Sequence, residues 1–203
     1  MSWYEVNGKN SEGYSDPTAT TAMANINREK RRMRGLQNRI EGEHFEKLIS
    51  VSLDWYQTNG VAYIEKTPEP MKPISKPNQQ GQFKACYIKA GQPDFKGTLV
   101  GGRAIVFEAK HTSGDRIEYG RLTEKQIESL TTHARLGAAS YVMVSFRLQT
   151  FYRIPWNVWY KMKELYGRKY IMEKDVQQYR LKYESGVIRL LEGIETTVKD
   201  MEG

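Results

Sequence analysis

The most constraining feature of this sequence is an apolar run, preceded by glycines, that carries two charged residues. The run extends from Ala104 to Lys110, follows the pair Gly101-Gly102 and reads Ala-Ile-Val-Phe-Glu-Ala-Lys. Such a run predicts a buried strand, and strand side chains alternate between the two faces, so Glu108 and Lys110 should share a face. Because burying two unpartnered charges costs several kcal/mol, their placement in this strand indicates a specific role.

A third charged residue, Asp94, lies just ahead of this strand in the pair Pro93-Asp94. A hairpin at the glycines would bring Asp94 to the same face. Two carboxylates can hold a hard divalent cation, and an adjacent ammonium can stabilise charge that develops on a phosphate. Asp94, Glu108 and Lys110 therefore form a candidate metal-dependent nuclease centre that hydrolyses phosphodiesters. The alternative is an edge-strand ion pair between Glu108 and Lys110 without a catalytic role.

Size and charge narrow the class of protein. The chain has 203 residues, which suffices for one domain with a substantial core and is too short for two ordinary domains. Lys and Arg total 31 against 24 Asp and Glu, a net charge of +7 that suits a polyanionic partner, although a merely soluble basic surface is the alternative. The single cysteine, Cys86, excludes an internal disulfide. With no membrane-length apolar stretch and no signal-peptide pattern, the sequence predicts a soluble, cytoplasmic protein.

The N-terminal part of the chain divides into a polar tail and a basic segment. Residues 1–27 are rich in Ser, Thr, Asn and Gly, which predicts a flexible tail. Residues 28–203 are expected to form a single nuclease domain. This domain opens on a run of Arg and Lys in which Arg31, Arg32 and Arg34 are candidate DNA contacts. The alternative is a solvated basic helix end.

From Gly42 onward the sequence predicts an amphipathic helix. Apolar residues recur at intervals of three and four as far as Tyr56, and Asn59-Gly60 then ends the helix. At ~100° per residue, Glu46 lies at the margin of the apolar face, so its carboxylate could reach a site in the fold. Glu46 is therefore a candidate catalytic acid, and an ordinary boundary glutamate is the alternative.

A proline-rich insertion follows a first predicted strand over residues 61–66. Four of the chain's seven prolines fall within residues 68–77, and proline at this density prevents a regular central strand or helix. Long insertions are usually functional or disordered, and since residues 68–89 carry several lysines we expect a projecting basic arm. A mobile loop without a binding role is the alternative. The candidate DNA contacts in and around this arm are Lys66, Lys72, Lys76, Lys84, Lys89 and Arg103.

The rest of the chain predicts a mixed α/β fold. Thr123 and Gln126 match a capping box, and the helix that they open should end before Gly137. Gln126 therefore has a structural role to weigh beside any catalytic one. The remaining expected elements are paired strands at 138–146 and 150–154 and helices near 158–165 and 188–194.

Several segments of the sequence, taken in order, resemble the RecU-type Holliday junction resolvases, a branch of the restriction-endonuclease-like PD-(D/E)xK nuclease superfamily. The resemblance covers roughly residues 34–155 and is specific because several segments match in order. It implies an α/β fold in which a restriction-endonuclease-like mixed β-sheet is flanked by helices and carries a projecting basic stalk. The matching segments are residues 42–46, 62–70, 94–97, 102–103, 107–112 and 126–128.

The resemblance also implies how the candidate residues act. It implies Mg²⁺, with Mn²⁺ as a substitute, held near Asp94 and Glu108, with Gln126 as a further ligand or orienting group and Lys110 stabilising the transition state. Gln92 stands where a threonine ligand is expected, and its side-chain carbonyl oxygen could still reach the metal. Lys125 stands where the family often has histidine.

The expected function is Mg²⁺-dependent cleavage of Holliday junctions by paired symmetric nicks, in DNA recombination and repair. The resemblance implies a homodimer whose stalk, residues 68–89, enters the open centre of four-way branched DNA, with recombination proteins as further partners. The alternatives are another PD-(D/E)xK DNA nuclease and a non-catalytic junction-binding protein. The sequence leaves open whether the chain comes from a bacterium or a phage.

Overall fold

The structure, a computed structural model, describes residues 17–88 and 91–194. Its first element is the long helix α1 (Pro17–Thr58). Within this helix the chain divides into two compact units, residues 1–37 and residues 38–203.

The first unit corrects the expected start of the helix. The sequence placed that start at Gly42, whereas α1 already begins at Pro17 and includes residues 17–27 of the expected tail. Proline is tolerated in the first turn of a helix, and Gly35 costs only about 1 kcal/mol relative to alanine, so neither stops helix formation by the Arg, Lys, Met and Leu around them. Residues 1–16 lie outside the described residues, and their flexibility stays a prediction.

The second unit is built on a six-stranded sheet with the order β1-β4-β5-β7-β8-β10. Its strands pair antiparallel except for β5 and β7, which are parallel. Helix α2 (Glu124–Arg135) lies in the connection between those two strands. The strands are β1 (Ala62–Lys66), β4 (Phe95–Leu99), β5 (Ala104–Thr112), β7 (Ala139–Phe146), β8 (Thr150–Pro155) and β10 (Arg180–Leu181).

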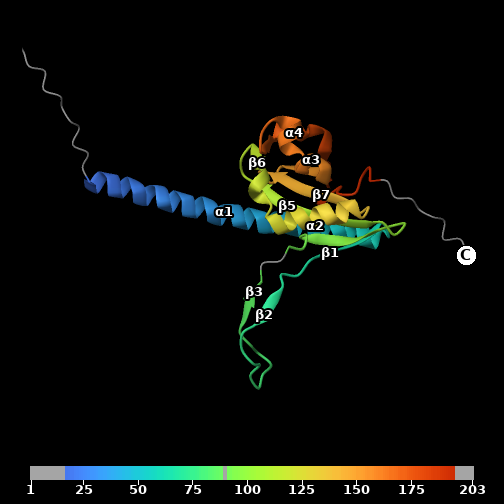
Figure 1. The fold of residues 1–203 in the computed structure, drawn as a ribbon, viewed down its shortest axis with the longest axis horizontal. Helices are drawn as coiled ribbons and strands as arrows, with labels where there is room; N and C mark the ends of the chain where they lie inside the picture. The colour runs from blue at the N-terminus through green and yellow to red at the C-terminus, as the bar shows by residue number, and fades with distance from the viewer. Residues whose placement is uncertain (1–16, 89–90, 195–203) are drawn as a thin grey trace, which may run out of the picture. The chain divides into compact units, whose positions relative to one another are not determined.

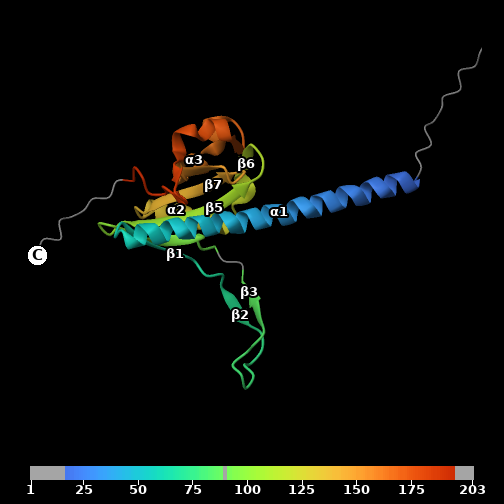
Figure 2. The same cartoon turned by 180° about the vertical axis from the view of Figure 1, so that it is seen from behind.

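Helices cover both faces of this sheet, as Figures 1 and 2 show from opposite sides. On one face, Phe45 and Ile49 of α1 belong to a buried cluster with Phe107 of β5. On the other face, Leu130 of α2 belongs to a second cluster with Val106. This alternation along β5 confirms the predicted buried strand and the mixed α/β fold class, and it places Glu108 on the α2 face.

Smaller elements complete the unit. Two short helices, α3 (Trp156–Tyr160) and α4 (Met162–Tyr166), confirm the helical pattern expected near residues 158–165. The helix expected near residues 188–194 is wrong. Ile188 lies in a short hairpin and Leu191 in the turn that follows it, and both side chains are buried there without helical structure. Three apolar residues at helical spacing are too few to nucleate a helix without a cap. The remaining short strands are β6 (Arg116–Glu118), β9 (Tyr170–Met172), β11 (Tyr183–Glu184) and β12 (Val187–Ile188).

The proline-rich insertion forms a separate hairpin of β2 (Met71–Pro73) and β3 (Ala85–Tyr87). This hairpin leaves the main sheet in both views (Figures 1 and 2), as the expected projecting arm does. At its tip, the Asn78 side-chain oxygen accepts hydrogen bonds from the backbone N–H groups of Gln80 and Gln82. Lys89, a candidate DNA contact, lies outside the described residues. In the described part of the chain, no helix is long and apolar enough to cross a membrane.

Gly97→Ala is expected to destabilise the sheet by about 3 kcal/mol or more, since overpacking against backbone cannot relax by a side-chain rotation. A Cβ atom at Gly97 would lie 2.0 Å from the Tyr63 carbonyl oxygen and 2.5 Å from Ile64 Cα. Denaturant unfolding measures the loss. Gly114→Ala is the matched control, because its nearest neighbour would be 3.6 Å away. Equal stability of the two variants would contradict the β1–β4 packing.

Candidate active site

Three charged side chains meet on the α2 face of the sheet. Lys110 Nζ lies 2.7 Å from Glu108 Oε2 and 3.3 Å from Asp94 Oδ2. The β4–β5 hairpin produces this meeting, since Asp94 precedes β4 and its Oδ2 also accepts a hydrogen bond from the Ala109 backbone N–H at 2.9 Å. The predicted convergence is therefore present. The Glu108–Lys110 ion pair of the alternative is present as well, in a strand that lies between β4 and β7, and the catalytic role of these residues stays a prediction.

Burial controls the electrostatics of this cluster. The Glu108 side chain is fully buried, and desolvation raises its pKa to about 8, opposed by Lys110 and assisted by Asp94. Burial alone would lower the pKa of Lys110, but the two carboxylates outweigh it and raise that pKa. A proton or a cation is therefore needed to neutralise the site.

The donor set fits a divalent cation. Glu108 Oε1 is buried and has no hydrogen-bond partner within the described residues. An orphaned carboxylate oxygen is costly unless a proton or cation approaches it, and carboxylate oxygens are the ligands that hard cations prefer. Asp94 and Glu108 could hold such a cation together. The described residues contain no cluster of three or more His, Cys, Asp or Glu side chains suited to a metal.

Gln126 orients Glu108 from helix α2. Its Nε2 donates to Glu108 Oε2 at 2.6 Å, while its Oε1 accepts from the Thr123 backbone N–H at 3.0 Å. The predicted capping box is confirmed. Because the cap occupies the side-chain oxygen, Gln126 presents its amide N–H and not its carbonyl to the site.

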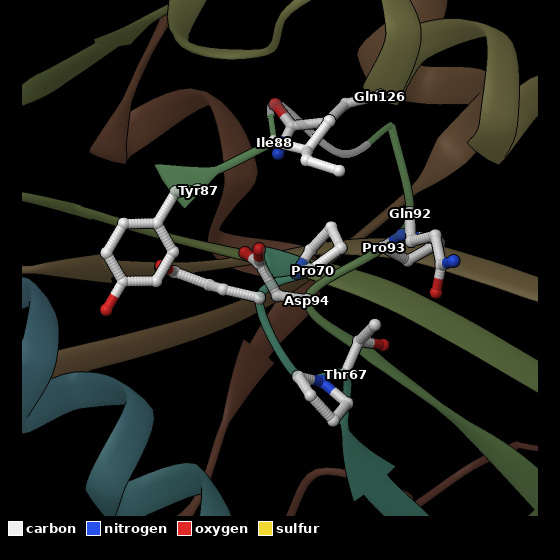
Figure 3. A pocket seen from close by; sticks show the side chains of 10 residues that line it. Thr67, Pro70, Tyr87, Ile88, Gln92, Pro93, Asp94 and Gln126 are labelled. Carbon is white, nitrogen blue, oxygen red and sulfur yellow. The ribbon is translucent and has the colours of Figure 1, made fainter. Parts of the chain in front are cut away.

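Gln92 lies in the same pocket as Asp94 but faces elsewhere. Its Oε1 accepts a hydrogen bond from Lys96 Nζ at 3.2 Å. Figure 3 shows its side chain directed away from Asp94. The structure therefore does not bring the Gln92 carbonyl to the carboxylates.

Glu46 meets a basic residue across the fold. Its carboxylate pairs with Lys66 Nζ of β1 at 2.7 Å, and this hydrogen bond raises the pKa of Lys66. This partner comes from strand β1 and not from the helix that carries Glu46. Glu46 is not joined to Asp94 or Glu108 by a hydrogen bond in the described structure, and its catalytic role stays a prediction.

A pocket of about 320 Å³ opens beside Asp94 at the base of the hairpin. In Figure 3, Tyr87 and Ile88 lie on two sides of Asp94, with Thr67 at the end of β1. Sequence reasoning missed Thr67, whose hydroxyl is buried without a hydrogen-bond partner in the described structure, and Tyr87, whose ring is exposed. Thr67 follows β1 and Tyr87 ends β3, and no local pattern could have indicated that these strand ends meet.

The candidate DNA contacts fall in three places, which are helix α1, strand β1 with the hairpin that follows it, and the start of β5. Those of the first unit, Arg31 and Arg32 among them, are exposed on α1. Arg103 directly precedes β5, at the strand end remote from Lys110, and its Nε donates to the Gly137 carbonyl at 3.3 Å. The full set of exposed candidates is Arg31, Arg32, Arg34, Lys66, Lys72, Lys76, Lys84 and Arg103.

His111, which follows Lys110, anchors the end of β5 to helix α1. Its ring is buried, with Nε2 2.8 Å from Glu41 Oε2 and Nδ1 3.4 Å from Ser145 Oγ. Glu41 Oε2 also accepts from Ser113 Oγ at 2.9 Å. This network fixes the strand on the face opposite the carboxylates. No local pattern indicated it, since its hydrogen bonds join residues that are 34, 70 and 72 positions apart.

Comparison with known proteins adds a second kind of observation. The sequence profile of a family described as RecU, Recombination protein U, matches residues 40–196. A Holliday junction resolvase RecU from Streptococcus gordonii is 28% identical over 145 residues, covering 68% of this chain and 71% of the relative. The Holliday junction resolvase RecU from Bacillus pumilus is 26% identical over 159 residues, covering 71% and 77%.

Among solved structures, a match is found to Hjc from Archaeoglobus fulgidus, described as a Holliday junction resolvase from an archaeal hyperthermophile. The two chains are 19% identical and superpose with a TM-score of 0.37 over 58% of this chain and 75% of the other.

Proposed function

The chain belongs to the RecU family, and from this premise we propose that it is a Holliday junction resolvase, an endonuclease that hydrolyses phosphodiester bonds in four-way DNA. The observation that carries the proposal is the meeting of Asp94, Glu108 and Lys110 on one buried face. The relatives named above are resolvases, and the basic hairpin beside the site suits branched DNA.

Each residue of the site has a task in this reaction. The Ala109 N–H fixes Asp94, and the Gln126 amide fixes Glu108, so the two carboxylates are held in place before DNA arrives. Lys110 places its ammonium where it can donate to an oxygen of the scissile phosphate and stabilise the charge that develops there. Mg²⁺, or Mn²⁺ in its place, held by Asp94 and Glu108 would activate the attacking water and neutralise phosphate charge.

The assembly that we propose is a homodimer in the cytoplasm. Two-fold symmetry would supply two equivalent sites, one for each of two opposed strands, and thereby paired symmetric nicks. The hairpin would enter the open centre of the junction, and recombination proteins would be further partners.

Cleavage assays test the proposal. Labelled four-way junctions, linear duplexes and single strands are incubated with the protein, with and without Mg²⁺. Paired nicks in the junction alone, and only with the metal, are expected. Cleavage of duplex at the same rate would indicate a different PD-(D/E)xK nuclease, and binding without cleavage would indicate a junction-binding protein.

Replacing residues 71–86 by a short linker should reduce the preference for four-way junctions over duplex on the order of tenfold, because Lys72, Lys76 and Lys84 are lost together. Among the strands of the described residues, β2 and β3 pair with each other and not with the main sheet, so the core sheet should remain folded. Competition binding measures the preference, and circular dichroism checks the fold. Unchanged selectivity in a folded variant would place discrimination elsewhere.

Metal affinity should depend on pH through Glu108, whose pKa is raised to about 8. Because a cation and a proton compete for this carboxylate, the apparent affinity should rise about tenfold per pH unit up to about 8 and then level off. Calorimetric titration of Mg²⁺ at several pH values measures this rise. Glu108→Gln should bind the metal weakly without the pH dependence, whereas a flat profile in the unaltered protein would oppose the assignment.

A further inference from the structure

Next to the active site, a groove lies between Gly91 and one side of helix α2. Its volume is about 340 Å³, and it is lined by Gly91, Lys125, Glu128, Ser129, Thr132 and His133. The groove adjoins Gln126, whose Nε2 lies 2.6 Å from Glu108 Oε2.

Four of the lining side chains can donate hydrogen bonds from one side of α2. At ~100° per residue, Lys125, Ser129, Thr132 and His133 fall within about 100° of the helix circumference. Their side chains have no hydrogen-bond or ion-pair partner within the residues that the structure describes. The Thr131 hydroxyl, by contrast, donates to the Ile127 carbonyl at 2.7 Å. As far as the described residues extend, the groove therefore presents donors without partners.

Glycine at position 91 fixes the groove relative to the active site. A Cβ atom there would lie 2.7 Å from Lys125 Cβ and 3.3 Å from the Lys125 carbonyl oxygen. The chain at Gly91 thus rests directly on the first turn of α2, three residues before Asp94. Because the same two segments supply Asp94 and Gln126, the groove is held at a fixed position relative to the carboxylate site.

Glu128 places one negative charge in the same groove. On the helix it lies about 60° from Lys125, on the side away from His133. It should repel an anion that the ammonium and hydroxyl groups attract. Removing Lys125 and removing Glu128 should therefore have opposite effects on the affinity of the groove for an anionic ligand.

We propose that this groove binds a phosphate of the DNA strand being cut, close to the scissile phosphate along that strand. Ammonium and hydroxyl groups are common donors to DNA phosphates, and such contacts set the register of a strand without reading its bases. The groove thereby positions the strand over Asp94 and Glu108. This inference rests on the proposed nuclease function.

The test is a charge scan of the junction. Phosphates near the cut are replaced one at a time by neutral methylphosphonates, and binding is measured with a chelator present, so that the reading does not depend on cleavage. One of these replacements, at the phosphate that the groove contacts, should weaken junction binding by the unaltered protein. The same replacement should not change junction binding by Lys125→Ala, which has already lost that contact. With the ordinary junction, Lys125→Ala should lower the slope of log affinity against log salt by about one.

Glu128→Gln should bind the ordinary junction more tightly than the unaltered protein does. This gain in affinity should disappear when a methylphosphonate replaces the same phosphate. Lys163→Ala, on the exposed surface of α4, is the matched control and should keep the sensitivity of the unaltered protein. If Lys125→Ala retains full sensitivity at every position, the groove does not bind a phosphate. Failure of the unaltered protein to cleave junctions would instead refute the proposed function, which the cleavage assays report separately.

Discussion

Glu108→Gln is expected to reduce junction cleavage roughly a thousandfold while junction binding is retained. The substitution removes the buried carboxylate whose Oε1 has no partner within the described structure, and with it half of the cation site. It keeps the shape of the side chain. Affinity for DNA should not fall, because a negative charge near the phosphates is removed. Single-turnover cleavage and equilibrium binding of the same labelled junction measure the two effects.

The stability of this variant can be predicted from the same pKa. Folding raises the pKa of Glu108 from its ordinary 4.5 to about 8, so the folded protein binds the proton more tightly than the unfolded chain. The free energy of unfolding of the metal-free protein should therefore fall as the pH rises from about 4.5 to about 8. Glu108→Gln should lack this decline, which denaturant unfolding at several pH values can detect.

Asp94→Asn and Glu43→Gln test the same active-site assignment. Asp94→Asn should lose cleavage in the same way, since Asp94 is the other carboxylate of the site. Glu43→Gln is the matched control, because Glu43 is exposed and its ion pair within the described residues is with Arg39 at the surface, where ion pairs contribute little. Cleavage at the unaltered rate by Glu108→Gln or Asp94→Asn with Mg²⁺ would remove these residues from the active site.

Lys110→Met is expected to lower the cleavage rate of the saturated enzyme by about a hundredfold or more, with little change in affinity. Its ammonium lies 2.7 Å from Glu108 Oε2 and is largely buried, so it is placed to act on the reacting phosphate and not on the DNA surface. Lys110 also opposes the rise in the Glu108 pKa. Its loss should raise that pKa further and shift metal binding to higher pH.

The informative comparison is Lys96→Met. Lys96 is an exposed lysine of the neighbouring strand that contacts Gln92, and it should affect binding more than the rate. Titration of enzyme against junction separates the two parameters. A Lys110→Met protein that binds poorly but cuts normally at saturation would identify Lys110 as an anchor for a phosphate.

Local patterns were enough to predict part of this site. The period of two along a strand placed Glu108 and Lys110 on one face, and the capping box fixed the start of α2 and the position of Gln126. The turn at the glycines brought Asp94 back to them. These features depend on residues a few positions apart, whose geometry is set by the backbone.

The start of helix α1 shows where such patterns fail. Apolar periodicity reports which residues are buried, and the expected helix therefore began where burial begins, near Phe45. The helix itself extends back to Pro17 through residues such as Ile26 and Met33, which are exposed. A helical segment without a buried face shows no apolar periodicity, and helix propensity alone is a weaker signal in the sequence.

The sequence by itself determined the central strand, the face that bears the acids and the basic hairpin, because each follows from short-range spacing and composition. Only the tertiary structure decided which distant partners these residues meet. It paired Glu46 with Lys66, joined His111 to Glu41 and brought Gly91 onto Lys125. Strand register and helix packing set these contacts, and they depend on the whole core, so no segment of the chain encodes them alone.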